Sequence, residues 1–123
     1  MLQASNRLRR SADLKRVRQQ GQGRPHPLAV LLTVANDLEV SRFAFVASRR
    51  VGNAVKRNRA RRLLREVVRL HLSQIEPGWD CMFIARQATA QATYAEVETA
   101  VLQLLARSHL LKDTLTSDPG RTS

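Results

Sequence analysis

The segment 48–69, SRRVGNAVKRNRARRLLREVVR, carries the side chains best suited to hold another molecule. It contains nine Arg or Lys residues and one acid, Glu66. A solvated helix face usually mixes both signs, with Glu placed to pair a Lys or Arg four residues further on. The planar guanidinium of arginine reaches a phosphate with two parallel hydrogen bonds and also stacks on flat rings. A bound polyanion would relieve the repulsion among these charges, and nucleic acid is the first candidate.

This segment predicts an amphipathic helix over 53–72, because its apolar residues recur at helical spacing. The apolar side holds Ala60, Leu63, Leu64, Val67, Val68 and Leu70. The opposite side holds Arg57, Arg61, Arg62, Arg65 and Arg69. A helix on a membrane surface would carry the same charge, but it also needs a free apolar face. The apolar face of 53–72 is better used to pack against strands.

The chain before this helix predicts one further helix and two strands. Residues 11–20 predict a short helix, with Ser11 as its N-cap and Gly21 as its C-terminal stop. Two Gly and two Pro in 21–27 predict a loop. The apolar run 28–35 predicts a strand buried on both faces, and 40–48 a second strand. We expect these two strands to pair as an antiparallel hairpin.

The chain after the basic helix predicts one strand and one helix. Residues 79–86 form an apolar run typical of a buried strand. Thr93 and Glu96 match a capping box, so a helix should follow over about 94–109. The elements together predict an α/β arrangement around one sheet.

Length and composition favour a single folded domain over 1–123. The chain has 123 residues, of which 43% are hydrophobic, and a formal net charge of +11. We expect an ordered core over about 5–112 and a flexible polar tail over 113–123. No run of 18 apolar residues occurs, and the single cysteine, Cys81, cannot form an internal disulfide. These features favour a cytoplasmic protein with no membrane partner and an inert, buried thiol.

The sequence predicts no catalytic residue and no metal site in the protein. Its ten acids are scattered, whereas metal-dependent nucleases cluster their carboxylates. The three histidines, His26, His71 and His109, have no Cys or acidic partner at metal-ligand spacing. His71 follows the basic helix beside its apolar stripe, where we expect a boundary residue and not a general base.

One motif is specific enough to indicate a family. Residues 51–59, VGNAVKRNR, followed by Arg62 and Arg65, resemble the signature of the bacterial ribonuclease P protein family. Arg49 and Arg50 stand where that family commonly has two lysines. The resemblance extends over about 5–112, including 6–8, 80–86 and the capping box at 93–96.

The resemblance implies an α+β fold, a single α-β-β-β-α-β-α sandwich with a left-handed β-α-β crossover, against the general right-handed rule. It implies a non-catalytic subunit, one per ribonuclease P RNA, that binds this RNA and precursor tRNA. The RNA would hold Mg²⁺ and remove the 5′ leader, leaving a 5′-phosphate. The protein would lower the magnesium requirement by neutralising charge. The residues expected to contact RNA are Arg49, Arg50, Asn53, Lys56, Arg57, Asn58, Arg59, Arg62, Arg65 and Arg69, with Asn53 and Asn58 in structural or polar-contact roles.

The resemblance also implies a cleft for the single-stranded 5′ leader, between the first helix and the sheet. The corresponding residues here are Leu14, Arg18 and Leu32. None is aromatic, although aromatic walls are usual for stacking single-stranded bases. We therefore expect a cleft that acts mainly through charge and apolar contact.

Three alternatives share some of these features. A ribosomal-type structural RNA-binding protein would have the same size and charge, but not the 51–65 motif. A DNA-binding protein would need a helix-turn-helix or a dimer element, and neither is recognisable. An autonomous nuclease would need clustered carboxylates. Activity that strictly requires an added catalytic RNA separates the ribonuclease P interpretation from all three.

Overall fold

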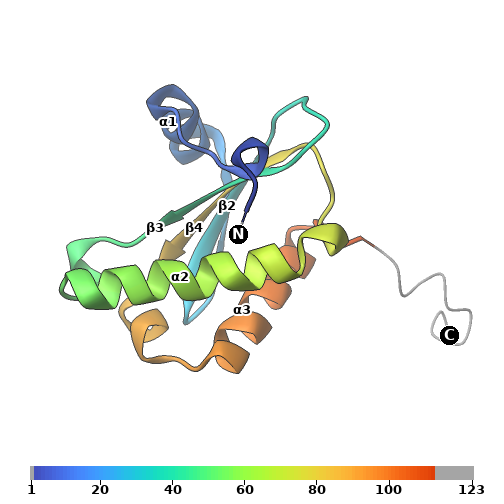
Figure 1. Cartoon of the computed structure of the whole chain (residues 1–123). Coiled ribbons are helices and arrows are strands. Elements are labelled where there is room, and N and C mark those ends of the chain that lie inside the picture. Colours follow the sequence, from blue (N-terminus) through green and yellow to red (C-terminus); the bar gives the residue numbers. More distant parts are fainter. Residues whose placement is uncertain (1, 113–123) are drawn as a thin grey trace, which may run out of the picture.

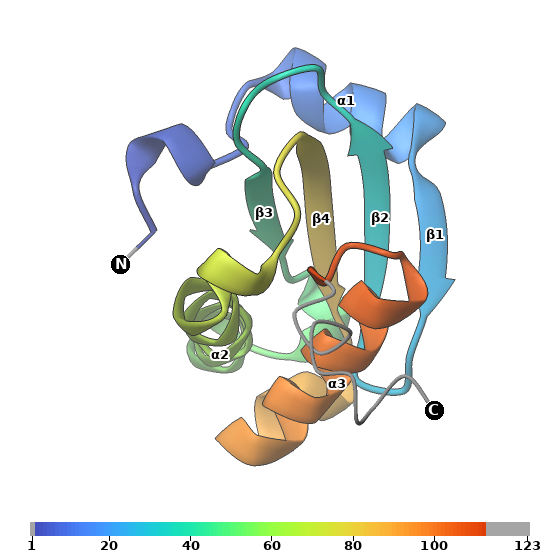
Figure 2. The same ribbon diagram turned by 90° about the vertical axis from the view of Figure 1, so that its right-hand side faces the viewer.

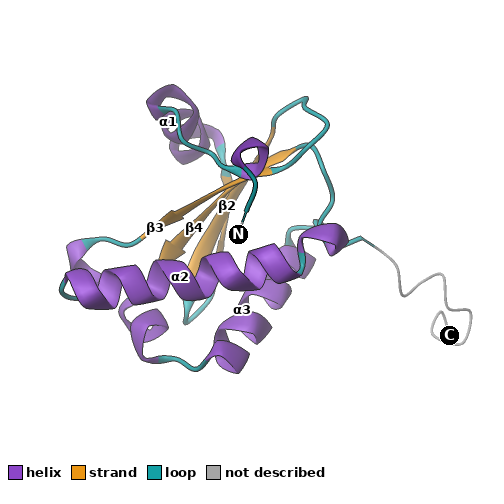
Figure 3. Ribbon diagram, in the orientation of Figure 1, coloured by secondary structure: helices purple, strands orange, loops and turns teal. Residues whose placement is uncertain are grey.

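A computed structural model of the chain describes residues 2–112 (Figures 1 and 3). The predicted tail over 113–123 lies outside the described residues. The helices are α1 (Ser11–Gln20), α2 (Ala54–Leu70) and α3 (Tyr94–Arg107). The strands are β1 (Gln22–Pro25), β2 (Ala29–Ala35), β3 (Arg42–Val46) and β4 (Trp79–Ala85), and short 3-10 turns connect several elements.

The four strands form one mixed sheet in the order β1-β2-β4-β3. Strand β2 is antiparallel to both β1 and β4, whereas β3 is parallel to β4. The predicted hairpin between β2 and β3 is therefore wrong, because β4 lies between them. Residues 80–83 of β4 are all buried, and a strand covered on both faces is best placed inside a sheet.

Strand β1 corrects a second prediction, since residues 21–27 were expected to form only a loop. Residues 22–25 pair with 30–33 of β2 at the edge of the sheet. Pro25 is tolerated there because it ends an edge strand, where a missing N–H leaves no central ladder bond unmade.

The connection from β3 through α2 to β4 is left-handed, as the resemblance implied. In Figure 2 the helices α2 and α3 lie in front of the sheet, β3 and β4 both run downwards, and β4 lies to the right of β3. A right-handed connection would place β4 on the other side of β3.

The sheet buries a separate apolar cluster on each face. Helices α2 and α3 cover one face, where Leu64, Val67 and Leu104 pack with Leu31 and Phe83. Helix α1 covers part of the opposite face at one end, as Figure 1 shows. The smaller cluster there contains Leu8, Val17, Ala44 and Met82.

Two of the predicted helix ends are confirmed, and one predicted N-cap is wrong. The capping box of α3 is confirmed, because Thr93 accepts from the Glu96 N–H and Glu96 accepts from the Thr93 N–H. Helix α1 begins at Ser11, so Arg10 is its N-cap and makes no side-chain cap bond. Gly21 ends α1 as predicted, and a Cβ there would clash with the Val17 carbonyl oxygen.

Candidate nucleic-acid interface

A tight turn leads from β3 into α2 and orients the first basic residues. The Ser48 hydroxyl accepts a hydrogen bond from the Arg50 N–H at 3.3 Å. Gly52 follows with φ +140°, which a side chain would strain. Asn53 is the N-cap of α2, and its Oδ1 accepts from the Lys56 N–H at 3.0 Å. The Gly-Asn pair of the motif therefore sets the direction in which α2 begins.

Four of the predicted RNA-contacting side chains are exposed and unengaged. They are Arg49, Arg50, Lys56 and Arg62. Within residues 2–112, none of the four side chains makes a hydrogen bond or an ion pair. Their cationic groups can therefore bind phosphate without first breaking an internal contact.

Three other predicted contacts are engaged within the protein. Arg59 donates to the carbonyl oxygens of Ala90 at 2.9 Å and Ala92 at 3.3 Å, which ties α2 to the 3-10 turn before α3. Arg69 pairs with Glu66 at 2.9 Å, and Arg57 donates to the Gly52 carbonyl at 3.3 Å. These contacts give all three a structural role, whatever they also do towards RNA.

Two more predicted residues, Asn58 and Arg65, lie seven positions apart on one side of α2, and each has a partner within the protein. The Arg65 guanidinium carbon lies 5.7 Å from the centre of the Phe45 ring, a cation–π arrangement. Phe45 in turn stacks on Phe83, with ring centres 5.9 Å apart. The Asn58 amide oxygen accepts a hydrogen bond from Arg61.

The C-terminal end of α2 differs from its prediction at Leu70 and at His71. Leu70 was predicted to lie on the apolar side, but it is 56% exposed, in the last turn of α2. His71 has an acidic partner that its sequence neighbours did not reveal, since Nε2 lies 2.7 Å from Glu98 Oε2 on α3. The hydrogen bond to Glu98 raises the pKa of His71. The pair links the C-terminal end of α2 to α3, and His71 Nδ1 also lies 3.1 Å from Gln74 Oε1.

Leu14, Arg18 and Leu32, assigned to the leader cleft, are only partly brought together. Leu14 of α1 and Leu32 of β2 are half-buried in the cluster between α1 and the sheet. Arg18 is exposed, one residue beyond the buried Val17. Apolar contact and one cation are thus available on the α1 side of the sheet.

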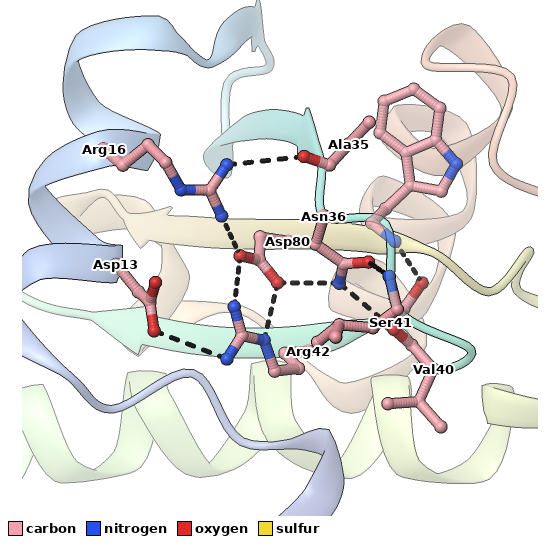
Figure 4. A network of polar contacts seen from close by, with 10 residues as sticks. Asp13, Arg16, Ala35, Asn36, Val40, Ser41, Arg42 and Asp80 are labelled. Atoms are coloured by element: carbon pink, nitrogen blue, oxygen red, sulfur yellow. Dashed lines mark hydrogen bonds and ion pairs between the residues drawn. The ribbon is translucent and has the colours of Figure 1, made fainter.

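A buried carboxylate that was not among the predicted site residues fixes α1 against the sheet (Figure 4). Asp80 of β4 is fully buried and accepts from Arg42 of β3, Arg16 of α1 and Asn36. Burial alone would raise the pKa of Asp80, but the hydrogen bonds from Arg42 and Asn36 and the nearby charges outweigh it and lower the pKa. An acid at the start of an apolar strand was the available signal, since buried charges require partners.

Within residues 2–112 no three His, Cys, Asp or Glu side chains could hold one ion together. Cys81 is buried, and burial raises the pKa of its thiol. No helix in the same part of the chain is both long and apolar enough to span a membrane.

The mixed sheet and the four unengaged cations define a class: a small basic α+β protein with an exposed cationic surface around the start of α2. The chain belongs to the ribonuclease P protein family, whose model, described as Ribonuclease P, matches residues 2–109. It is 44% identical over 107 residues to a ribonuclease P protein component of Dehalococcoides mccartyi, covering 87% of this chain and 88% of that one. It is 36% identical over 110 residues to one of Alkaliphilus metalliredigens, covering 89% and 99%.

Solved structures of the family share the fold. The ribonuclease P protein of Staphylococcus aureus matches with a TM-score of 0.79 at 27% identity, covering 87% of this chain and 98% of that one. The ribonuclease P protein of Thermotoga maritima matches with a TM-score of 0.75 at 28% identity, covering 82% and 96%.

Proposed function

We propose that the chain is the non-catalytic protein subunit of ribonuclease P and assists RNA-catalysed removal of the 5′ leader from precursor tRNA. Its family and its distribution of charge support this role. The observation that carries the proposal is the unengaged set Arg49, Arg50, Lys56 and Arg62, on the turn before α2 and on the helix itself. These side chains present their charge to solvent, where the backbone of the catalytic RNA can reach it.

The protein would contribute binding and positioning, and the RNA the chemistry. Each phosphate contact releases condensed counterions, which drives association and screens RNA–RNA repulsion. The complex should therefore need less Mg²⁺ than the RNA alone. The Mg²⁺ ions that assist hydrolysis are assigned to the RNA, because the described part of the protein lacks a cluster of ligands for them. We expect one protein per RNA, in the cytoplasm.

The leader of precursor tRNA is assigned to the α1 side of the sheet. Leu14 and Leu32 supply apolar contact there, and Arg18 supplies a cation near phosphate. Without aromatic walls, stacking contributes less than the usual 1–3 kcal/mol or so per base. Replacing Arg18 with Ala should weaken binding of leader-bearing precursor tRNA more than binding of leaderless tRNA. Equal weakening of both would contradict the assignment of the leader to this site.

The deciding experiment is cleavage of 5′-labelled precursor tRNA by a bacterial ribonuclease P RNA at low magnesium, with and without the protein. The wild type should restore correct cleavage only when the RNA is present. The Arg62→Ala, Arg65→Ala double variant should restore it poorly. The matched control is Arg107→Ala on α3, which also removes a cation and whose side chain contacts the Pro25 carbonyl at the β1 edge.

Two outcomes would overturn the proposal. RNA binding without any effect on cleavage would leave a general structural RNA-binding protein. Cleavage by the protein alone would mean that the scattered acids do form a catalytic site.

A further inference from the structure

The outer edge of β3 is only partly covered. The N-terminal segment runs beside this edge, where the Asn6 amide donates to the Ser41 carbonyl and the Leu8 N–H donates to the Phe43 carbonyl, both at 2.9 Å. Outward backbone groups recur at every second residue of a strand, so the Phe45 N–H and carbonyl point to the same edge. The N-terminal segment has by then turned away into α1, and no described residue bonds to these two groups from that side.

A cavity of about 560 Å³ lies at this edge. Phe43 and Phe45 line it from the α2 side of the sheet, and Ala44 and Val46 from the α1 side. A cavity lined from both faces of one strand spans the strand's edge, where the open Phe45 backbone groups lie. Its size falls in the range of about 300–1,000 Å³ found for sites of small organic molecules.

Three arginines surround the cavity, and none of its lining residues is acidic. Arg9 is exposed and makes no side-chain bond within residues 2–112. Arg7 uses its Nε to bond the Leu2 carbonyl at 3.1 Å, which leaves the two terminal nitrogens of the guanidinium to bind a ligand. Arg65 lies over the Phe45 ring with its guanidinium carbon 5.7 Å from the ring centre, and a planar guanidinium is a group that stacks on bases.

We propose that this cavity receives one unpaired nucleotide of the catalytic RNA, an assignment that rests on the proposed function. The apolar floor and Arg65 would hold the base, the Phe45 N–H and carbonyl would bond its edge, and Arg7 and Arg9 would bind the adjoining phosphates. An extended peptide could also add to a strand edge. It would not need three cations and a flat stacking surface, which suit a nucleotide.

The catalytic RNA is favoured over the precursor leader by continuity. Arg65 belongs to α2, the helix assigned to the catalytic RNA, and the cavity extends from it to the N-terminal segment. The leader is assigned to the α1 side, and only Leu14 is shared between the two sites.

Site-specific photocrosslinking tests the occupant. Because Cys81 is buried, an Arg9→Cys substitution introduces a thiol that can be labelled selectively with an azidophenacyl group. At saturating protein, irradiation of the complex with catalytic RNA and labelled precursor tRNA should crosslink one unpaired nucleotide of the catalytic RNA. Arg107→Cys, labelled in the same way, should not crosslink that nucleotide. Crosslinks to the leader, to another protein chain or to no RNA would each overturn the proposal.

Binding of the catalytic RNA provides a second measurement. Arg9→Ala should weaken binding about five-fold and reduce the slope of log K against log salt by roughly 0.7–0.9, the loss of one phosphate contact. Arg107→Ala should change neither quantity. If Arg62→Ala weakens binding but Arg9→Ala does not, the cavity assignment fails while the α2 interface stands. If neither weakens it, the proposed function itself fails.

Discussion

The guanidinium of Arg42 donates to both carboxylate oxygens of Asp80, with Nε 2.8 Å from Oδ1 and Nη2 2.7 Å from Oδ2. Arg16 of α1 pairs with the same carboxylate and also donates to the Ala35 carbonyl at 3.3 Å. The network therefore joins α1, β2, β3 and β4 at one end of the sheet (Figure 4). It determines where α1 lies, and so the shape of the proposed leader cleft.

Replacing Asp80 with Asn should lower the free energy of unfolding by about 3 kcal/mol, because two arginines lose a buried counter-ion. Urea denaturation followed by circular dichroism measures this. Asp13→Asn is the matched control, since Asp13 reaches Arg42 only at 3.4 Å and is partly exposed; its loss should stay below about 1 kcal/mol. Equal losses in the two variants would contradict the central role of Asp80.

The same carboxylate should contribute to acid sensitivity. The pKa of Asp80 is lowered in the folded state, so its stabilisation is present above its unfolded pKa, about 3.9, and is lost as pH falls through the folded value. Wild-type stability should therefore decline in this acid range more steeply than that of Asp80→Asn. Parallel declines would mean that other carboxylates dominate.

Arg59 and Arg62 should separate stability from RNA binding, although they are three residues apart on one helix. Arg59→Ala removes the bonds to the Ala90 and Ala92 carbonyls and should cost about 1–2 kcal/mol of unfolding free energy. Arg62→Ala should leave stability unchanged within about 0.5 kcal/mol and weaken RNA binding. Thermal unfolding and filter binding on both variants measure the two effects. If Arg59→Ala unfolds with the same free energy as the wild type, the bonds from Arg59 to the two carbonyls contribute little to stability.

The His71–Glu98 pair should make stability depend on pH near neutrality. The pKa of His71 is raised in the folded protein, chiefly by its hydrogen bond to Glu98. Its contribution is therefore fully present below the unfolded pKa, about 6.5, and is lost as pH rises through the folded value. The pair should therefore make the free energy of unfolding larger at pH 6.0 than at pH 8.5. Glu98→Gln should reduce the difference; an unaltered difference would assign it to other groups.

Cys81 should report on global opening of the fold. The thiol is fully buried in the main core, and burial raises its pKa above the ordinary value. Its reaction with an aromatic disulfide at pH 8 should be at least about 100-fold slower in native buffer than in urea beyond the unfolding midpoint. Rapid reaction in native buffer would show that the core around β4 opens locally.

Local physics explains what could be predicted from the sequence. The 3.6-residue period of 53–72 requires only neighbours on one helix, and it correctly placed Ala60, Leu64, Val67 and Val68 in the core. The capping box at Thr93 and Glu96 is equally local. The motif at 51–65 indicated the family and, through it, the left-handed crossover, which periodicity alone does not contain.

Tertiary structure decided the features that depend on distant partners. Residues 22–25 form a strand only because β2 offers them an edge, and β4 displaced the expected β2–β3 hairpin. Arg59 is held by carbonyls 31 and 33 residues away, and Asp80 by arginines 38 and 64 residues away. Sequence spacing shows that a cation or a carboxylate is present, but its partner is set by the packing that brings remote segments together. The sequence by itself thus determined the helices, the charge and the family, while the fold decided which arginines are engaged within the protein and which remain exposed and unengaged.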